Sequence, residues 1–97
     1  MQVSVRFFTT LREVTGKREE TIEFTEASAA TLEDVLQKLT KKHGKDFTEY
    51  VYDRRTHQPK GYLQFLINGK SITPTKGFQT KLRDGDVLAI IPPVGGG

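Results

Sequence analysis

The reactive group suggested most strongly by this sequence is the α-carboxylate of Gly97, at the end of the stretch PPVGGG. A carboxylate is inert until it is activated, but adenylation by ATP converts it into an acyl donor for sulfide, a thiol or a lysine amine. The two prolines restrict the backbone to extended conformations, which gives the six residues a reach of roughly 20 Å. The glycines lack a Cβ, so catalytic groups of another protein can approach their backbone closely. The pattern predicts a tail that enters a narrow channel in another protein. The tail consists of Pro92, Pro93, Val94, Gly95, Gly96 and Gly97.

A frayed terminus or a cloning remnant is the alternative interpretation of this tail. The apolar stretch VLAII runs without a break into PPVGGG. This continuity favours a tail that leaves a strand of the body at a fixed point. Both interpretations remain open at the level of the sequence.

The side chains of the body offer little for catalysis. The sequence contains no cysteine, which excludes a thiolate nucleophile, sulfur ligands and disulfides. Its two histidines, His43 and His57, have no second ligand or nucleophile at a useful spacing. The stretch NGKS lacks the leading glycine of a phosphate-binding loop, because that position is Gln64. We therefore expect no bound cofactor, no metal site and no independent active site.

Composition indicates one small globular domain. The chain has 97 residues, of which 35% are hydrophobic and 28% are charged. The formal net charge is +3, but basic and acidic residues are interleaved, so we expect neither a nucleic-acid groove nor nucleic-acid partners. No apolar run is long enough to cross a bilayer, and no signal peptide is visible. Together with the absence of cysteine, these features favour a cytoplasmic protein without a membrane partner.

Hydrophobic spacing predicts one main helix and several strands. The helix runs from residue 32 to about 43, begins after Thr31 as N-cap and ends before Gly44. Its apolar face follows the i, i+3, i+4, i+7 spacing and consists of Leu32, Val35, Leu36 and Leu39. Alternating segments predict strands near residues 3–7, 19–24, 62–67, 70–72 and 87–91. Shorter helical turns are expected near residues 9–16 and 47–51, and Asn68-Gly69 predicts a hairpin turn.

This order of elements predicts an α+β protein with the β-grasp fold, in which a mixed sheet of about five strands wraps around one main helix. The strand pairs before and after the main helix can share one sheet only if the chain crosses over the helix. The first and last strands would then be central and parallel. The domain would comprise residues 1–91, and residues 92–97 would form the tail.

Apolar residues on both faces of the last strand predict a partner-binding patch near the tail. A solvated face of an antiparallel sheet is expected to be polar, but Val87, Ala89 and Ile91 alternate with two further apolar residues. The alternative is that the segment 45–61 folds over this surface. Our candidate partner-binding residues are Phe8, Phe65, Leu66, Leu88 and Ile90.

The sequence resembles the ubiquitin-like sulfur-carrier family, and within it the small subunits of molybdopterin synthase. The resemblance spans most of the chain and is carried by VSVRFFTTLREVTGK, TLEDVLQKL, FLINGKSI and LRDGDVLAIIPPVGGG. It implies a β-grasp fold and adenylation of Gly97 by an E1-like enzyme that uses ATP. It also implies a thiocarboxylate at Gly97, insertion of Gly95 and Gly96 into the synthase large subunit, and donation of sulfur to a pterin precursor of the molybdenum cofactor.

Two features depart from that pattern. The segment 45–61 is longer than in the shortest members, and Gly95 stands where a small non-glycine residue is usual. Both features resemble small archaeal modifier proteins, which become attached to lysines. A protein modifier, a carrier for tRNA or thiamine thiolation, and a binding module with a passive tail therefore remain alternatives.

Overall fold

The computed structural model describes residues 1–25, 29–72 and 77–92. The described residues form a five-stranded sheet with the strand order β2-β1-β7-β4-β5. These strands are β1 (Gln2–Phe7), β2 (Glu19–Glu23), β4 (Gln64–Ile67), β5 (Lys70–Ser71) and β7 (Val87–Ile91). Strands β1 and β7 are parallel and central, and the other pairs are antiparallel. The predicted topology is thus confirmed, and the described domain has the β-grasp arrangement.

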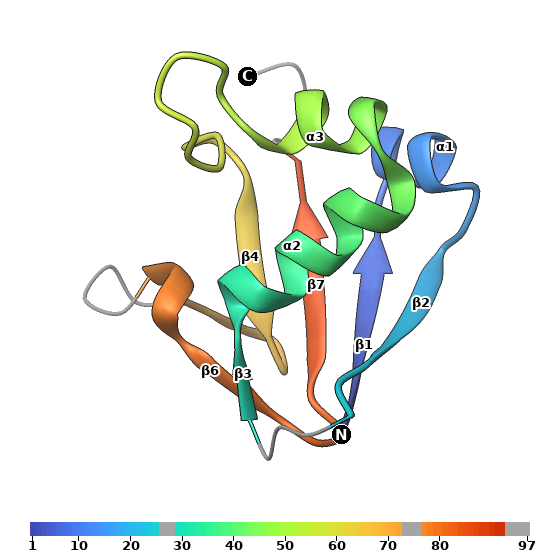
Figure 1. Cartoon of the computed structure of the whole chain (residues 1–97), viewed down its shortest axis with the longest axis vertical. Helices are drawn as coiled ribbons and strands as arrows, with labels where there is room; N and C mark the ends of the chain where they lie inside the picture. The colour runs from blue at the N-terminus through green and yellow to red at the C-terminus, as the bar shows by residue number, and fades with distance from the viewer. Residues whose placement is uncertain (26–28, 73–76, 93–97) are drawn as a thin grey trace.

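Helix α2 (Leu32–His43) lies across one face of this sheet, as Figure 1 shows. It begins with a capping box, in which the Asp34 amide donates to Thr31 Oγ1 at 3.1 Å and the Thr31 amide donates to Asp34 Oδ2 at 3.0 Å. It ends at His43, and the next residue, Gly44, has a φ of 77°, which is favourable only for glycine. All four predicted apolar residues of α2 are buried, so the prediction of this helix is confirmed.

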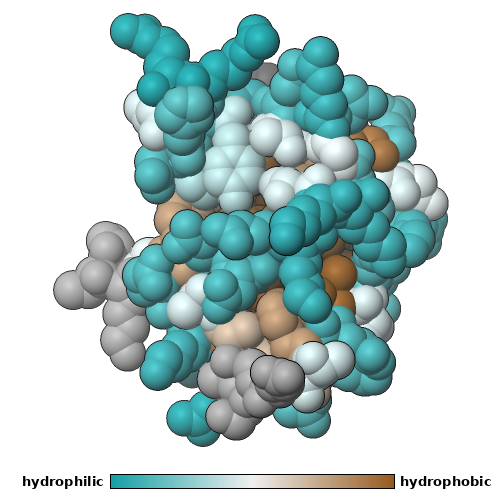
Figure 2. Space-filling view, viewed as in Figure 1, coloured by the Kyte–Doolittle hydropathy of each residue, from teal (hydrophilic) through white to brown (hydrophobic). Residues whose placement is uncertain are grey.

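Two shorter helices complete the cover of the sheet. Helix α1 (Thr10–Thr15) ends at Gly16, and α3 (Lys45–Val51) follows α2 directly. Leu11 of α1 and the pair Phe47 and Val51 of α3 belong to the same buried cluster as the apolar face of α2. The three helices therefore pack on one face of the sheet, which is called the inner face below. Figure 2 shows that hydrophilic residues cover most of the outside of this helical layer.

The hairpin between β4 and β5 turns at Asn68 and Gly69, whose φ values are 52° and 84°. The sequence predicted this turn because both positions require positive φ. The side chain of Asn68 also accepts from the Val87 amide at 2.9 Å and donates to Asp86 at 2.9 Å. These bonds attach the hairpin to the start of β7.

A second sheet was not predicted from the sequence. Strands β3 (Ala29–Thr31) and β6 (Lys81–Arg83) pair with each other beside the N-terminal end of α2, and a 3-10 helix η1 (Gly77–Gln79) precedes β6. Three residues are too few for a period of two to be recognised. Leu82 of β6 is nevertheless fully buried and contributes to the core.

Candidate functional site

The candidate site starts where β7 ends. Ile91, the last residue of β7, is paired with Gln64 of β4, and Ile90 is paired with Phe7 of β1. Because strands flank β7 on both sides, the chain leaves the middle of the sheet at Pro92, which is buried. The prediction that Pro92 ends the last strand is therefore confirmed. The other tail residues, Pro93, Val94, Gly95, Gly96 and Gly97, lie outside the described residues, and their proposed roles stay predictions.

Phe8 lies at the same end of the sheet, directly after β1. It is half-buried, and the Arg12 guanidinium lies 5.6 Å from the centre of its ring. Arg12 Nε also donates to the Phe7 carbonyl at 3.1 Å, which fixes α1 against the end of β1. Thr9, between the two elements, has a φ of 48°, which is unusual for a β-branched residue. The aromatic ring is thus held in place beside the end of β7 and remains partly accessible.

Three of the residues predicted to form an exposed patch lie in the core. Leu88 and Ile90 have no exposed surface, and Phe65 is 4% exposed. The register explains this, because Leu88 pairs with Val5, and Ile90 pairs with both Phe7 and Phe65 on the inner face. The prediction that these three residues bind a partner at the surface is wrong. Phe47 and Val51 of α3 belong to the same buried cluster, so part of the segment 45–61 contributes to the core that contains this set.

The outer face of the sheet carries the other apolar set. Leu66 of β4 is paired with Ala89 of β7, and both are partly exposed, as are Val87 and Ile91. These four residues, called the outer apolar strip below, run along the sheet to the point where the tail begins. On one side the strip is flanked by an exposed ion pair between Arg6 and Glu19, with Nε and Oε2 3.5 Å apart. Of the predicted patch, Leu66 belongs to this strip.

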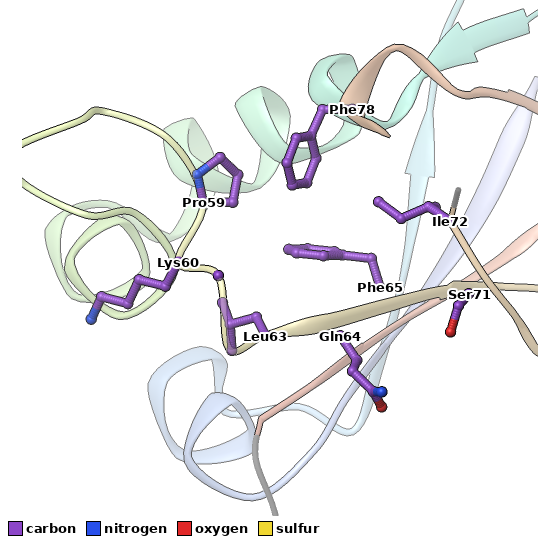
Figure 3. Close-up of a pocket in the computed structure, with 9 residues that line it drawn as sticks. Pro59, Lys60, Leu63, Gln64, Phe65, Ser71, Ile72 and Phe78 are labelled. Carbon is purple, nitrogen blue, oxygen red and sulfur yellow. The ribbon is translucent and has the colours of Figure 1, made fainter. Parts of the chain in front are cut away.

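A hollow of about 340 Å³ opens next to strands β4 and β5. Figure 3 shows Phe65 and Phe78 facing each other across it, with Pro59, Leu63 and Ile72 around them. The rings of Phe65 and Phe78 are 5.2 Å apart and nearly perpendicular. Its lining is mainly apolar, and Lys60 is its one ionisable residue among those described. This arrangement suits packing rather than catalysis.

Among the residues that the structure describes, one charged side chain is buried on the inner face. Glu20 of β2 has a side chain only 2% exposed and forms ion pairs with Lys17 and Lys42. Its Oε1 lies 2.7 Å from Nε2 of His43, whose ring packs edge-on against Phe7. Burial alone would raise the pKa of Glu20, but hydrogen bonds from Lys42 and His43 and the nearby charges lower it.

The sequence interpretation missed this cluster. From its spacing in the sequence, His43 was expected to have no second ligand or nucleophile nearby. The available signal was that Glu20 and Ile22 lie two residues apart in a predicted strand and therefore share one face, on which Ile22 is buried.

Neither a metal site nor a membrane-spanning helix appears in the described part of the chain. There, no three histidine, cysteine, aspartate or glutamate residues are grouped so that they could hold a metal ion. The helices of residues 1–25, 29–72 and 77–92 are too short and too polar to cross a membrane.

Two sequence relatives align with the whole chain. Small archaeal modifier protein 3 of Haloferax volcanii is 33% identical over 97 residues, which cover 100% of both proteins. The molybdopterin synthase sulfur carrier subunit of Chlamydomonas reinhardtii is 31% identical, again over 100% of both. The present chain is thus similar over its full length to a protein named as a modifier and to one named as a sulfur carrier.

Solved structures show the same fold. SAMP1 from Haloferax volcanii superimposes with a TM-score of 0.84 at 26% identity, covering 100% of both chains. A chain of the complex of subunits 1 and 2 of the molybdopterin-converting factor from Helicobacter pylori matches with a TM-score of 0.61 at 25% identity, over 100% of both. The model of the ThiS family matches residues 5–97. The chain therefore belongs to the ThiS family of ubiquitin-like sulfur carriers.

Proposed function

We propose that this chain is a sulfur carrier of molybdenum-cofactor synthesis, acting as the small subunit of a molybdopterin synthase. An E1-like enzyme would use ATP to adenylate the Gly97 carboxylate. One carboxylate oxygen attacks the α-phosphate, and pyrophosphate leaves. Sulfide then attacks the acyl carbon and displaces AMP, which gives a thiocarboxylate. The large subunit would receive the tail and transfer this sulfur to a pterin precursor.

The position of β7 is the observation that best supports this proposal. A central strand that ends just before Pro92 anchors the tail in the middle of the sheet, between β1 and β4. Phe8 and the outer apolar strip lie beside this anchor, and they offer a partner a partly apolar surface continuous with the tail. This composition and continuity fit the core of a protein–protein interface.

A protein modifier is the second candidate function. Its support is the 33% identity over the full chain with small archaeal modifier protein 3. In this case the activated Gly97 carbonyl would be attacked by a lysine amine, AMP or a thiol would leave, and an isopeptide bond would form. Sulfur transfer to tRNA would use the same thiocarboxylate with another acceptor.

Mass analysis of the untagged protein tests the proposal. The protein is incubated with its E1-like enzyme, ATP and sulfide, and the expected product has one terminal oxygen replaced by sulfur. Fragmentation must place the sulfur at Gly97, because oxidation of Met1 gives a nearly identical mass change. Sulfur at Gly97 followed by transfer to a pterin precursor supports the synthase role. An adenylate that reacts with lysines but never with sulfide would contradict it and favour the modifier.

A further inference from the structure

The segment that joins α3 to β4 forms an ordered loop. The Asp53 amide donates to the Gln58 carbonyl at 2.8 Å, and the Lys60 amide donates to the Val51 carbonyl at 2.8 Å. Tyr52 and Pro59 form an isolated antiparallel bridge at its base. The Asp53 carboxylate accepts from the backbone amides of the next turn, at 2.8 and 3.2 Å. A loop held in this way loses little conformational entropy when it binds a partner.

This loop presents positive charge to solvent. Arg54 and Arg55 are exposed at its tip, and Lys60 is half-buried on its return. Within the described ranges, none of the three takes part in an ion pair. Asp53 is the one acidic residue of the segment 52–62. Its carboxylate accepts hydrogen bonds from backbone amides of the loop. Figure 2 shows long hydrophilic side chains projecting at the end of the molecule where Figure 1 places this loop.

An exposed aromatic residue stands next to these charges. Tyr62 is 53% exposed, the largest exposure of a large hydrophobic residue in the described part of the chain. The Lys60 ammonium lies 5.9 Å from the ring centres of both Tyr62 and Tyr50. Tyrosine and arginine are among the residues that most often contribute strongly to protein–protein binding. The set Arg54, Arg55, Lys60 and Tyr62 is called the basic loop below.

The basic loop adjoins the place where the tail leaves the sheet. Gln64, two residues after Tyr62, is paired with Ile91, the residue before Pro92. Figure 1 shows the loop at the same end of the sheet as the end of β7. A protein that admits the tail must therefore approach the basic loop.

We propose that the basic loop docks on an acidic surface of the E1-like adenylating enzyme, beside the channel that receives the tail. This proposal rests on the proposed function. The adenylating enzyme is chosen because sulfur transfer and lysine conjugation both require adenylation first. A protein fits better than a nucleic acid, because the neighbouring outer face of β4 and β7 carries the outer apolar strip and no basic stripe continues from the loop along these two strands.

Charge complementarity of this kind acts mainly on the rate of association. The decisive variant is Arg54→Glu with Arg55→Glu, both at exposed positions. The matched control is Lys70→Glu with Lys81→Glu, which removes equal charge from exposed positions in β5 and β6. Binding of the full chain to the purified enzyme is followed by stopped flow without ATP, so that no reaction occurs. Thermal unfolding of each variant verifies that the fold is retained.

We expect the loop variant to associate about tenfold more slowly at low salt, with the difference shrinking as salt is added. The control should change the rate much less. Tyr62→Ser should mainly increase the dissociation rate, with a weaker dependence on salt. Equal losses in both charge variants would attribute the effect to net charge and overturn the proposal, as would an unchanged rate in the loop variant.

Three further outcomes are distinguishable. A polyuridine RNA probe whose binding depends on the basic loop, while enzyme binding does not, would overturn the proposal in favour of a nucleic-acid surface. Loop-dependent enzyme binding without any thiocarboxylate, adenylate or conjugate after addition of ATP would support the docking surface and contradict the proposed function. Normal sulfur transfer with loop-independent binding would contradict the docking surface alone.

Discussion

Strand β7 carries apolar side chains on both faces, and the two faces differ in what covers them. On the inner face, Leu88 and Ile90 have no exposed surface. On the outer face, Val87, Ala89 and Ile91 are partly exposed. All three helices contribute their buried residues to the inner cluster. The difference shows that apolar composition alone does not identify a binding surface, because the same strand supplies the core from one side and an accessible strip from the other.

The largest difference between the faces is expected for truncation of isoleucine. Ile90→Ala removes buried methyl groups from the centre of the core and should lower the free energy of unfolding by about 2–5 kcal/mol. Ile91→Ala, one residue further and on the outer face, should cost about 1 kcal/mol or less, because its side chain is only partly buried. Chemical denaturation of both variants measures this. Similar losses for the two would show that the outer strip is packed as tightly as the core.

Glu20 is the exception on the inner face, and its contribution depends on pH. Glu20→Gln breaks the ion pairs with Lys42 and Lys17 and weakens the bond to His43, and should cost about 1–2 kcal/mol at neutral pH. The folded state lowers the pKa of Glu20 below its ordinary value of 4.5. Its stabilisation is therefore fully present above pH 4.5 and disappears as the pH falls through the lowered value.

The difference in unfolding free energy between wild type and Glu20→Gln should thus shrink in acid. Urea denaturation between neutral pH and about pH 3 follows this trend. Glu23→Gln is the matched control, because Glu23 is exposed on the same strand and contacts Gln2. A difference that grows in acid would mean that the pKa of Glu20 is raised in the folded protein.

The same comparison explains what could be predicted from the sequence. The helix α2, the hairpin turn at Asn68-Gly69 and the central parallel pair were predictable, because caps, positive-φ residues and chain order are local or topological signals. The face of β7 that points inward was not, because alternation is invisible where every residue is apolar. It is decided by the register with Val5 and Phe7. Glu20 was missed because its partners Lys42 and His43 lie 22 and 23 residues away along the chain, at the end of α2.

The outer strip can be tested separately from the core through Leu66. Leu66→Asp places a charge in the strip next to Ala89 and, if the synthase role is correct, should weaken binding to the large subunit tenfold or more. Its cost in folding should be about 1 kcal/mol or less, because the side chain is only partly buried and β4 is short. Thr21→Asp, at an exposed outer position of β2, is the control.

Calorimetric titration of the large subunit measures both variants. Unchanged binding by folded Leu66→Asp would exclude this strip as the interface and leave Phe8 as the remaining residue of the patch predicted from the sequence. A loss shared by Thr21→Asp would instead indicate repulsion by any added negative charge.

The smallest effect on folding is expected from removing Gly96 and Gly97. The buried apolar residues of the described chain run from Val3 to Ile90, so truncation leaves this core intact. The free energy of unfolding should change by about 0.5 kcal/mol or less, whereas adenylation and sulfur transfer should be abolished because the reactive carboxylate is displaced by two residues. Denaturation and mass analysis of the same variant separate these effects. A large loss of stability would show that the tail belongs to the folded domain, and retained sulfur transfer would place the reactive group elsewhere.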